Sequence, residues 1–286
     1  MSIETNRKLA IIILFFNKLK QTTLCINSFL PSGENIYVLN NGSNKKEFQK
    51  LQDQFKSNCN VCFKDAGENL GPAGGRNLMI QNTTEPWLLF VDSDITVLQV
   101  EKWKFLLETF MTQNPESEII CPRIFNIHEN TYMERLNLKI KGRKMILEKS
   151  TDSITNVFPE GGVVIHRNVF MKNGLYDEKM FAFEGFEFAL RAIKSQFGEL
   201  KVSLLSEVDL IHDHQYQINY RDKESVYERY NEDKIGRSFD HFLYKHKIEF
   251  EHEWRYWSKN QRDMMTTPYL LRQLRKILNR FLDKLA

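Results

Sequence analysis

The sequence predicts an α/β fold in which a mostly parallel β-sheet is flanked by helices, and three observations support this. Short, continuous apolar runs such as residues 8–16 and 88–91 are typical of strands that are buried on both faces of a parallel sheet. Stretches with helical periodicity lie between these runs. The two patterns alternate along the chain, which is typical of βαβ units with right-handed crossovers.

The composition is that of an ordinary globular protein and argues against several classes. Hydrophobic residues make up 42% of the 286 residues and charged residues 27%, and the formal net charge is +3. That charge is too small to indicate nucleic acid binding, and no apolar run approaches the roughly 20 residues that span a bilayer. The four cysteines indicate a reducing compartment rather than a disulfide scaffold. We therefore expect a cytoplasmic protein.

Residues 1–100 contain the most regular part of the pattern. The first apolar run is short and leads into Asn17 without a cleavage site of small residues, so we interpret it as a strand and not as a signal peptide. The predicted strands are residues 8–16, 35–40, 60–64 and the run that ends at Asp92. The predicted helices are residues 18–29, 45–56 and a helix to about Gln81 that the glycine-rich stretch 68–77 opens.

The later part of the chain is less regular. Its predicted helices are residues 101–112, 168–173 and 181–197, and its predicted strands are residues 117–124, 161–165 and 201–211. Residues 124–156 are polar and poorly periodic, with a hairpin predicted around residues 141–143, and they resemble an insertion or a substrate-facing loop. Residues 216–286 are predicted to form two or three helices. The last of these, residues 269–285, is basic and amphipathic, which suits an anionic membrane surface, its own domain or a second subunit.

The most informative motif is Asp92-Ser93-Asp94, which directly follows the apolar run at residues 88–91. Side chains on a strand repeat every two residues, so Asp92 and Asp94 should point the same way. They should project into the crevice at the carboxyl ends of the strands, where open α/β sheets bind ligands. Paired carboxylates suit Mg²⁺ or Mn²⁺, and such a cation suits a diphosphate. Taken alone, the motif also fits a strand that ends in a solvated turn. The flanking motifs must therefore distinguish a metal site from such a turn.

The flanking motifs follow a recognisable order. In chain order they are Phe16-Asn17, Asn40-Asn41-Gly42-Ser43, Asn69-Leu70-Gly71 with Arg76-Asn77, and then Asp92-Ser93-Asp94. This order resembles the nucleotide-sugar-binding half of GT-A glycosyltransferases, especially family 2. The later motifs, which are Gly161-Gly162, Gly174 to Asp177 and Glu184 to Arg191, resemble the same group and also the polypeptide N-acetylgalactosaminyltransferases. The resemblance covers about residues 8–215.

The resemblance implies a metal-dependent donor site that prefers a UDP-sugar. Asp94 would coordinate Mn²⁺ or Mg²⁺ directly, and Asp92 would contact the ribose or reach the metal through water. His212 stands where related enzymes keep a C-terminal histidine ligand, and His214 is the alternative. The expected donor-binding residues are Phe16, Asn17, Asn40, Asn69, Gly71, Arg76, Asp92, Ser93 and Gly162. Asn40 replaces the Asp that usually contacts the base, and Arg76 would reach the base or the diphosphate as a fixed cation.

The acceptor side departs from the family pattern. The family's helix often carries an adjacent Glu-Asp pair whose Asp is the proposed base, whereas this sequence has Glu184-Gly185. Glu184 or Glu187 would then deprotonate the acceptor hydroxyl as it attacks the anomeric carbon. Glu187 and Arg191 lie four residues apart, which also suits a simple salt bridge, so we favour Glu184. Family 2 resemblance suggests inversion, whereas the resemblance to the N-acetylgalactosaminyltransferases suggests retention.

Two other functions fit parts of the sequence. Residues 92–96 match the D-x-D-x-[T/V] motif of haloacid-dehalogenase-like phosphatases, in which Asp92 would be the nucleophile. That motif usually follows the first strand, however, and here three strands precede it. A sugar-nucleotide-binding protein that has lost its base is the second alternative, because Gly185 replaces the expected acid.

We predict a glycosyltransferase that moves a sugar to a hydroxyl of a glycan, a lipid-linked glycan or a protein. Residues 1–215 would form the GT-A domain, with a donor-binding half at 1–100 and an acceptor-side half at 101–215, and residues 216–286 a helical extension. No nucleic acid partner is expected. The basic C-terminal helix would allow peripheral contact with the inner face of the membrane, or formation of a homo-oligomer.

Overall fold

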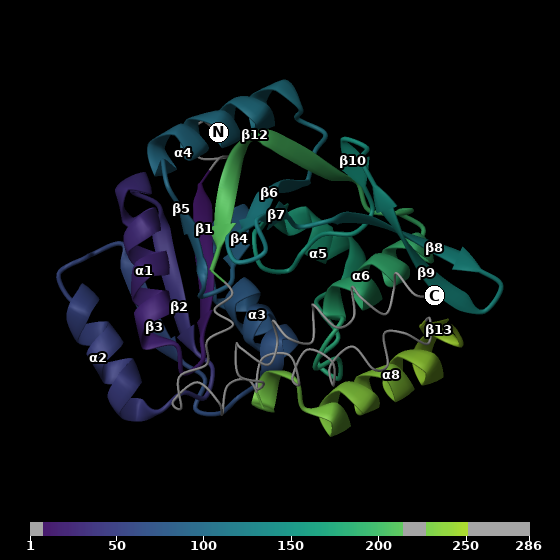
Figure 1. The fold of residues 1–286 in the computed structure, drawn as a ribbon, viewed down its shortest axis with the longest axis horizontal. Coiled ribbons are helices and arrows are strands. Elements are labelled where there is room, and N and C mark those ends of the chain that lie inside the picture. Colours follow the sequence, from purple (N-terminus) through teal and green to yellow (C-terminus); the bar gives the residue numbers. More distant parts are fainter. Residues whose placement is uncertain (1–7, 214–226, 251–286) are drawn as a thin grey trace, which may run out of the picture.

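One large mixed sheet organises the chain (Figure 1). The computed structural model describes residues 8–213 and 227–250. The strands of this sheet are β1 (Leu9–Phe15), β2 (Asn35–Asn40), β3 (Val61–Asp65), β4 (Trp87–Val91), β5 (Ile95–Val97), β6 (Ile119–Asn126), β7 (Thr131–Tyr132), β10 (Ile154–Thr155), β11 (Val163–His166) and β12 (Val202–His212). Within the described residues the order is β10-β12-β6-β11-β4-β1-β2-β3, with β5 beside β12 and β7 beside β6.

Helices cover both faces of the sheet because strand side chains alternate between two hydrophobic clusters. On β1, Ile11 and Ile13 belong to one cluster, and Ala10 and Ile12 belong to the other. The first cluster is covered by α1 (Leu19–Phe29), α2 (Lys45–Phe55) and α4 (Val100–Gln113). The second is covered by α3 (Gly71–Asn82), α5 (Arg167–Asn173) and α6 (Glu184–Ile193), which lie on the opposite face in Figure 1.

The predicted α/β fold is confirmed, and the sheet is parallel in its first half. Strand β1 pairs in parallel with β2 and β4, and β2 pairs in parallel with β3. Strand β11 then runs antiparallel to both β4 and β6, so the second half of the sheet is mixed. Several details differ from the prediction, and two of them lie next to the acidic motif or at the start of α6. The three-residue strand β5 was missed, and α6 begins at Glu184 rather than at residue 181 because Phe183 has a left-handed backbone (φ 63°).

Residues 124–156 are more regular than predicted. The expected hairpin is present, since β8 (Arg135–Lys141) and β9 (Lys144–Ser150) pair antiparallel around Gly142. Leu138 on β8 and Met145 on β9 are buried in the same cluster as α6, although the flanking residues are polar. The hairpin therefore packs on the domain through a few apolar side chains. So few apolar positions produce no clear hydrophobic periodicity in the sequence.

The described part of the C-terminal region is integrated into the fold. Helix α8 (Glu232–His246) buries Phe242 in the cluster that also contains α6, and the short strand β13 (Glu249–Phe250) pairs in parallel with β9. The sequence predicted helices there but not this strand. Among the described residues, none of the helices is long and apolar enough to cross a membrane. The basic helix at residues 269–285 lies outside the described residues, and the boundary at residue 215 stays a prediction.

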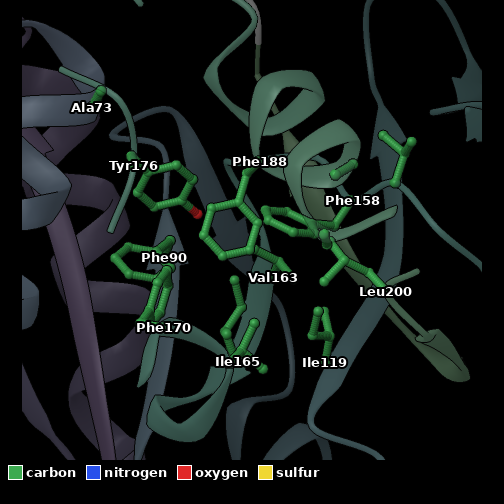
Figure 2. Close-up of a cluster of buried hydrophobic side chains, with 14 of the residues drawn as sticks. Ala73, Phe90, Ile119, Phe158, Val163, Ile165, Phe170, Tyr176, Phe188 and Leu200 are labelled. Carbon is green, nitrogen blue, oxygen red and sulfur yellow. The ribbon is translucent and has the colours of Figure 1, made fainter. Parts of the chain in front are cut away.

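An aromatic cluster attaches α6 to the end of β4 (Figure 2). The ring of Phe188, a fully buried residue of α6, lies 5.6 Å from the ring of Phe170 and 5.3 Å from that of Tyr176, centroid to centroid. Phe90 of β4 packs edge-on against Phe170 at 6.1 Å. These contacts hold α6 in one position relative to the acidic motif that follows β4.

Replacement of Phe188 by Ala should lower the free energy of unfolding by about 3–5 kcal/mol, because it removes a buried aromatic ring and leaves a cavity. Denaturant unfolding followed by circular dichroism measures this loss. Phe105→Ala is the matched control, since Phe105 is 66% exposed on α4, and it should change stability by less than about 0.5 kcal/mol. Equal losses in the two variants would contradict the role given to the cluster.

Candidate active site

The acidic motif lies at the carboxyl end of β4, as predicted, and forms one wall of a cavity. The backbone N–H of Ile95 donates to the carbonyl of Asp92 at 3.0 Å, so the chain turns sharply between β4 and β5. The cavity that opens here has a volume of about 400 Å³. The predicted site residues that line it are Phe16, Asn69, Gly71, Arg76, Asp92, Ser93, Asp94 and Glu184. They come from distant parts of the sequence.

The other predicted site residues do not line this cavity. These are Asn17, Asn40, Gly162, Glu187 and His212. Gly162 has a φ of +120°, and a Cβ there would lie 2.7 Å from Cδ1 of Ile124, so this glycine is needed for packing next to the site. His214, the alternative histidine, lies outside the described residues.

Asn40 and Asn41 have different tasks because neighbouring residues at a strand end point in different directions. The Asn40 side chain is buried, donates to Asp65 at 3.0 Å and accepts from the Ser43 N–H at 2.9 Å. Asn41, which was not predicted, lines the cavity. Its side chain donates to the carbonyl of Gly71 at 3.0 Å and so fixes the loop that opens α3.

The cavity also contains residues that were not predicted as site residues. They include Lys18, Glu160, Gly161, Phe181, Phe183 and Arg229. Gly161 belongs to the Gly161-Gly162 motif, of which only Gly162 was expected to bind the donor. A Cβ on Gly161 would lie 2.2 Å from Cγ of Asp92, and only glycine leaves room for that carboxylate. Arg229, by contrast, comes from the C-terminal region, and no motif there marked it.

The surroundings of Asp94 are suited to a divalent cation. Asp94 is 3% exposed, and its Oδ1 lies 3.4 Å from Nε2 of His212. The other ring nitrogen, Nδ1, lies 2.8 Å from the side-chain oxygen of Asn126, so we assign the hydrogen to Nδ1 and a lone pair to Nε2. Two ligands that each lie about 2.1 Å from one metal are about 3.0–3.4 Å apart.

The cation site would be incomplete without the donor. Within the described ranges there is no group of three or more His, Cys, Asp and Glu side chains that could hold a metal ion. Lys18 on the opposite side binds Oδ2 of Asp94 at 2.7 Å. A cation between Asp94 and His212 would therefore need further oxygen ligands from water or from a bound diphosphate.

A buried arginine connects the two ends of the cavity. Arg76 on α3 is 6% exposed, and its Nη1 lies 2.5 Å from Oε1 of Glu184 on α6. Its Nη2 lies 3.6 Å from Oδ1 of Asp92. Burial, and next the charge of Glu160, raises the pKa of Glu184 to about 7, although Arg76 acts in the opposite direction. A carboxyl group with such a pKa can accept a proton near neutral pH.

Glu187 belongs to a different environment from Glu184. It is completely buried, and it forms ion pairs with Arg191 at 3.1 Å, Lys245 at 2.8 Å and His246 at 3.0 Å. Burial alone would raise its pKa, but the hydrogen bond from His246 and the charge of Arg191 outweigh this effect and lower the pKa to about 2. Glu187 therefore connects α6 to α8 and faces no part of the cavity lining.

The family model described as glycosyl transferase family 2 matches residues 10–174. A teichoic acid poly(glycerol phosphate) polymerase of Staphylococcus epidermidis is 29% identical over 91 residues, which are 30% of this chain and 13% of that protein. The chain thus matches only a small part of this relative. An uncharacterized protein of Haemophilus influenzae is 22% identical over 161 residues, covering 56% of this chain and 85% of the relative.

Solved structures show the same fold. S. aureus TarS residues 1–349 aligns with a TM-score of 0.56 and 15% identity, covering 87% of this chain and 77% of that one. The complex of the same TarS fragment with UDP-GlcNAc aligns with a TM-score of 0.56 and 13% identity, covering 83% of this chain and 73% of that one. The structure of GalNAc-T7 with UDP, GalNAc and Mn²⁺ aligns with a TM-score of 0.54 and 14% identity, covering 87% of this chain and 56% of that one. The predicted GT-A fold, with similarity to both groups, is confirmed.

Replacement of Glu187 by Gln should destabilise the protein by about 3 kcal/mol, because it leaves neighbouring cations at a buried site without their counter-charge. The ionised form of Glu187 is favoured in the folded state, so its contribution is present above pH 4.5 and is lost as the pH falls towards 2. Urea unfolding at pH 7 and pH 3 measures both effects. Glu148→Gln, at an exposed ion pair with Lys139, is the control and should change little. A stable Glu187→Gln variant would contradict the structural role of this residue.

Proposed function

The chain belongs to glycosyl transferase family 2, and on this basis we propose that it transfers a sugar from a nucleotide sugar, by preference a UDP-sugar, to a hydroxyl group. The main support is one observation. Asp92 and Asp94 after β4 and Glu184 on α6 line the same cavity, and Arg76 lies between them. Similar folds hold UDP-GlcNAc in TarS and UDP, GalNAc and Mn²⁺ in GalNAc-T7.

The acidic motif would form the donor end of the site. We propose that Asp94 and His212 would hold Mn²⁺ or Mg²⁺, with Asp92 as a further contact, and such a cation would supply positive charge for the departing diphosphate. Lys18 and Arg76 add fixed positive charge at the same end, since they contact Asp94 and Asp92 respectively. Asn69 and Gly71, at the start of α3, also line this part of the cavity and would contact the nucleotide.

Glu184 would act at the acceptor end. Arg76 fixes its carboxylate at 2.5 Å, and the raised pKa of about 7 suits a group that accepts the proton of the attacking hydroxyl. Glu187 is the weaker candidate for this role because its side chain is fully buried against Lys245 and His246 of α8 and does not line the cavity. The base is therefore proposed to be Glu184.

The acceptor is proposed to be a glycan, a lipid-linked glycan or a protein. The β8–β9 hairpin, with β13 beside it, and the described part of the extension pack next to α6, so they would shape the acceptor side. The four cysteines are free, which agrees with the proposed cytoplasmic location. Contact with the inner face of a membrane, or with a second copy, would depend on residues 269–285.

The phosphatase alternative is wrong. Membership of glycosyl transferase family 2 contradicts it, and within the described residues β4 is the fourth strand, with three parallel strands before it. The remaining alternative, a binding protein without activity, is separated from an enzyme by incubation with labelled nucleotide sugars. Transfer, or slow release of UDP, supports the enzyme, whereas binding without either supports the alternative.

Replacement of Asp94 by Ala should abolish Mn²⁺-dependent turnover of the donor, because the variant lacks the carboxylate that faces His212. The release of UDP from a UDP-sugar measures turnover, and calorimetry with UDP and Mn²⁺ measures binding. Asp53→Ala, at an exposed position of α2, should behave as wild type. Turnover of Asp94→Ala within a few-fold of wild type would rule out the metal model.

Replacement of Glu184 by Gln should leave UDP binding within a few-fold of wild type but reduce transfer by about 10²-fold or more, as expected for loss of a general base. In the wild type, transfer should rise with pH through about 7, since the carboxyl group must lose its proton before it can act. Initial rates of the wild type and of the variant measure the loss of transfer and its pH dependence. The range should be about pH 5.5 to 8.5, which is about 1.5 pH units on either side of that pKa. If only Glu187→Gln lowers the rate, the base is Glu187 and not Glu184.

A further inference from the structure

Gly185 and Glu160 share one small volume at the start of α6. A Cβ built on Gly185 would lie 2.1 Å from Oε1 of Glu160 and 2.7 Å from its Cδ. Real Cβ atoms do not approach a carboxylate so closely, so a side chain at position 185 and the present position of Glu160 exclude one another. The carboxylate of Glu160 therefore fills the space where a side chain of residue 185 would begin.

The carboxylate is held in this place by the helix itself. The backbone N–H of Gly185 donates to Oε1 of Glu160 at 2.6 Å. The first N–H groups of a helix have no partner within the helix, and they carry partial positive charge, so they favour an anion there. Glu160 comes from the loop before β11, and this hydrogen bond attaches the loop to α6.

Glu160 also faces the cavity. It is one of the residues that line it, together with Asp92, Arg76 and Glu184. Oε1 accepts the hydrogen bond from Gly185, and Glu160 at the same time belongs to the lining of the cavity. Burial, as the largest effect, raises the pKa of Glu160, although Arg76 lowers it. An acid in such a place is costly unless a partner or a substrate compensates for the lost water.

We propose that Glu160 is a second catalytic residue, which supplies from the loop before β11 the acceptor-side carboxylate that the helix lacks at Gly185. This inference rests on the proposed function. The acceptor hydroxyl oxygen forms a bond to the anomeric carbon, and the bond from that carbon to the diphosphate oxygen breaks, with its electron pair going to the diphosphate. The hydroxyl proton passes to Glu160 and Glu184, which both line the cavity and would both contact the acceptor.

The two acids have different surroundings, which explains why both are needed. Glu184 is 5% exposed and is held by Arg76 at 2.5 Å. A carboxylate paired to a guanidinium has a lower proton affinity and a fixed position. Glu160 has no ion pair of its own among the described residues, and it adds negative charge next to Glu184, which favours uptake of the proton by the pair.

The first test is the conservative variant Glu160→Gln, which keeps the size of the side chain. UDP release from a UDP-sugar without acceptor, where water takes the place of the hydroxyl, should fall by about 10²-fold or more. Calorimetric binding of UDP with Mn²⁺ should stay within a few-fold of wild type. Glu116→Gln, at an exposed position after α4, is the control and should keep the wild-type rate. A rate for Glu160→Gln within a few-fold of wild type overturns the proposal.

The second test moves the carboxylate back to the helix. Glu160→Ala should be as slow as Glu160→Gln, and the double variant Glu160→Ala with Gly185→Asp should recover at least about tenfold, because removal of Glu160 makes room for the new side chain. Gly185→Asp alone should be less stable in thermal unfolding, because its Cβ meets Glu160. A folded double variant without recovery overturns the proposal.

Different results would contradict the proposed transferase activity and the proposed role of Glu160. If the wild type binds UDP but releases none from any UDP-sugar, the proposed function itself is wrong, and the role of Glu160 falls with it. If the wild type is active and Glu160→Gln is equally active, only the role of Glu160 is wrong.

Discussion

The ion pair between Arg76 and Glu184 is the interaction on which the arrangement of the site depends. It is buried, with 6% of Arg76 and 5% of Glu184 exposed, and it joins α3 to α6 across the end of the sheet. Asp92 approaches the same guanidinium from β4 at 3.6 Å. A buried cation needs counter-charges, so the position of Arg76 requires the carboxylates of Asp92 and Glu184 to converge on it.

The hydrophobic core makes this convergence possible. Side chains of β4 alternate between two clusters, and Phe90 packs in the one that contains Phe170 and Phe188. Because β4 and α6 share that cluster, the acids at their ends cannot move apart without exposing aromatic rings. Gly161 adds a local condition, since a Cβ there would overlap the carboxylate of Asp92. Core packing and Gly161 therefore determine where the carboxylates of Asp92 and Glu184 lie relative to Arg76.

The ion pairs of Glu187 and Glu184 show how one helix serves two purposes. Residues 184 and 187 are three apart, yet Glu184 faces the cavity whereas Glu187 is surrounded by Arg191, Lys245 and His246. Two of these partners, Lys245 and His246, belong to α8, which lies far along the chain. The sequence showed the pair with Arg191, but it contained no sign of the other two partners, because contacts between distant helices leave no periodic pattern.

The strand and helix pattern of residues 8–112, the acidic motif after β4 and the family resemblance were determined by local sequence, because burial periodicity and turn residues act over short distances. The antiparallel insertion of β11, the addition of β13 to the predicted β8–β9 hairpin, and the strand β5 were decided only by tertiary packing. The same holds for the site. Asp92 and Asp94 were visible as a motif, whereas the contact of Glu160 with Gly185 joins residues 25 apart and depends on a missing Cβ. A missing side chain becomes informative only when the structure shows what fills its place.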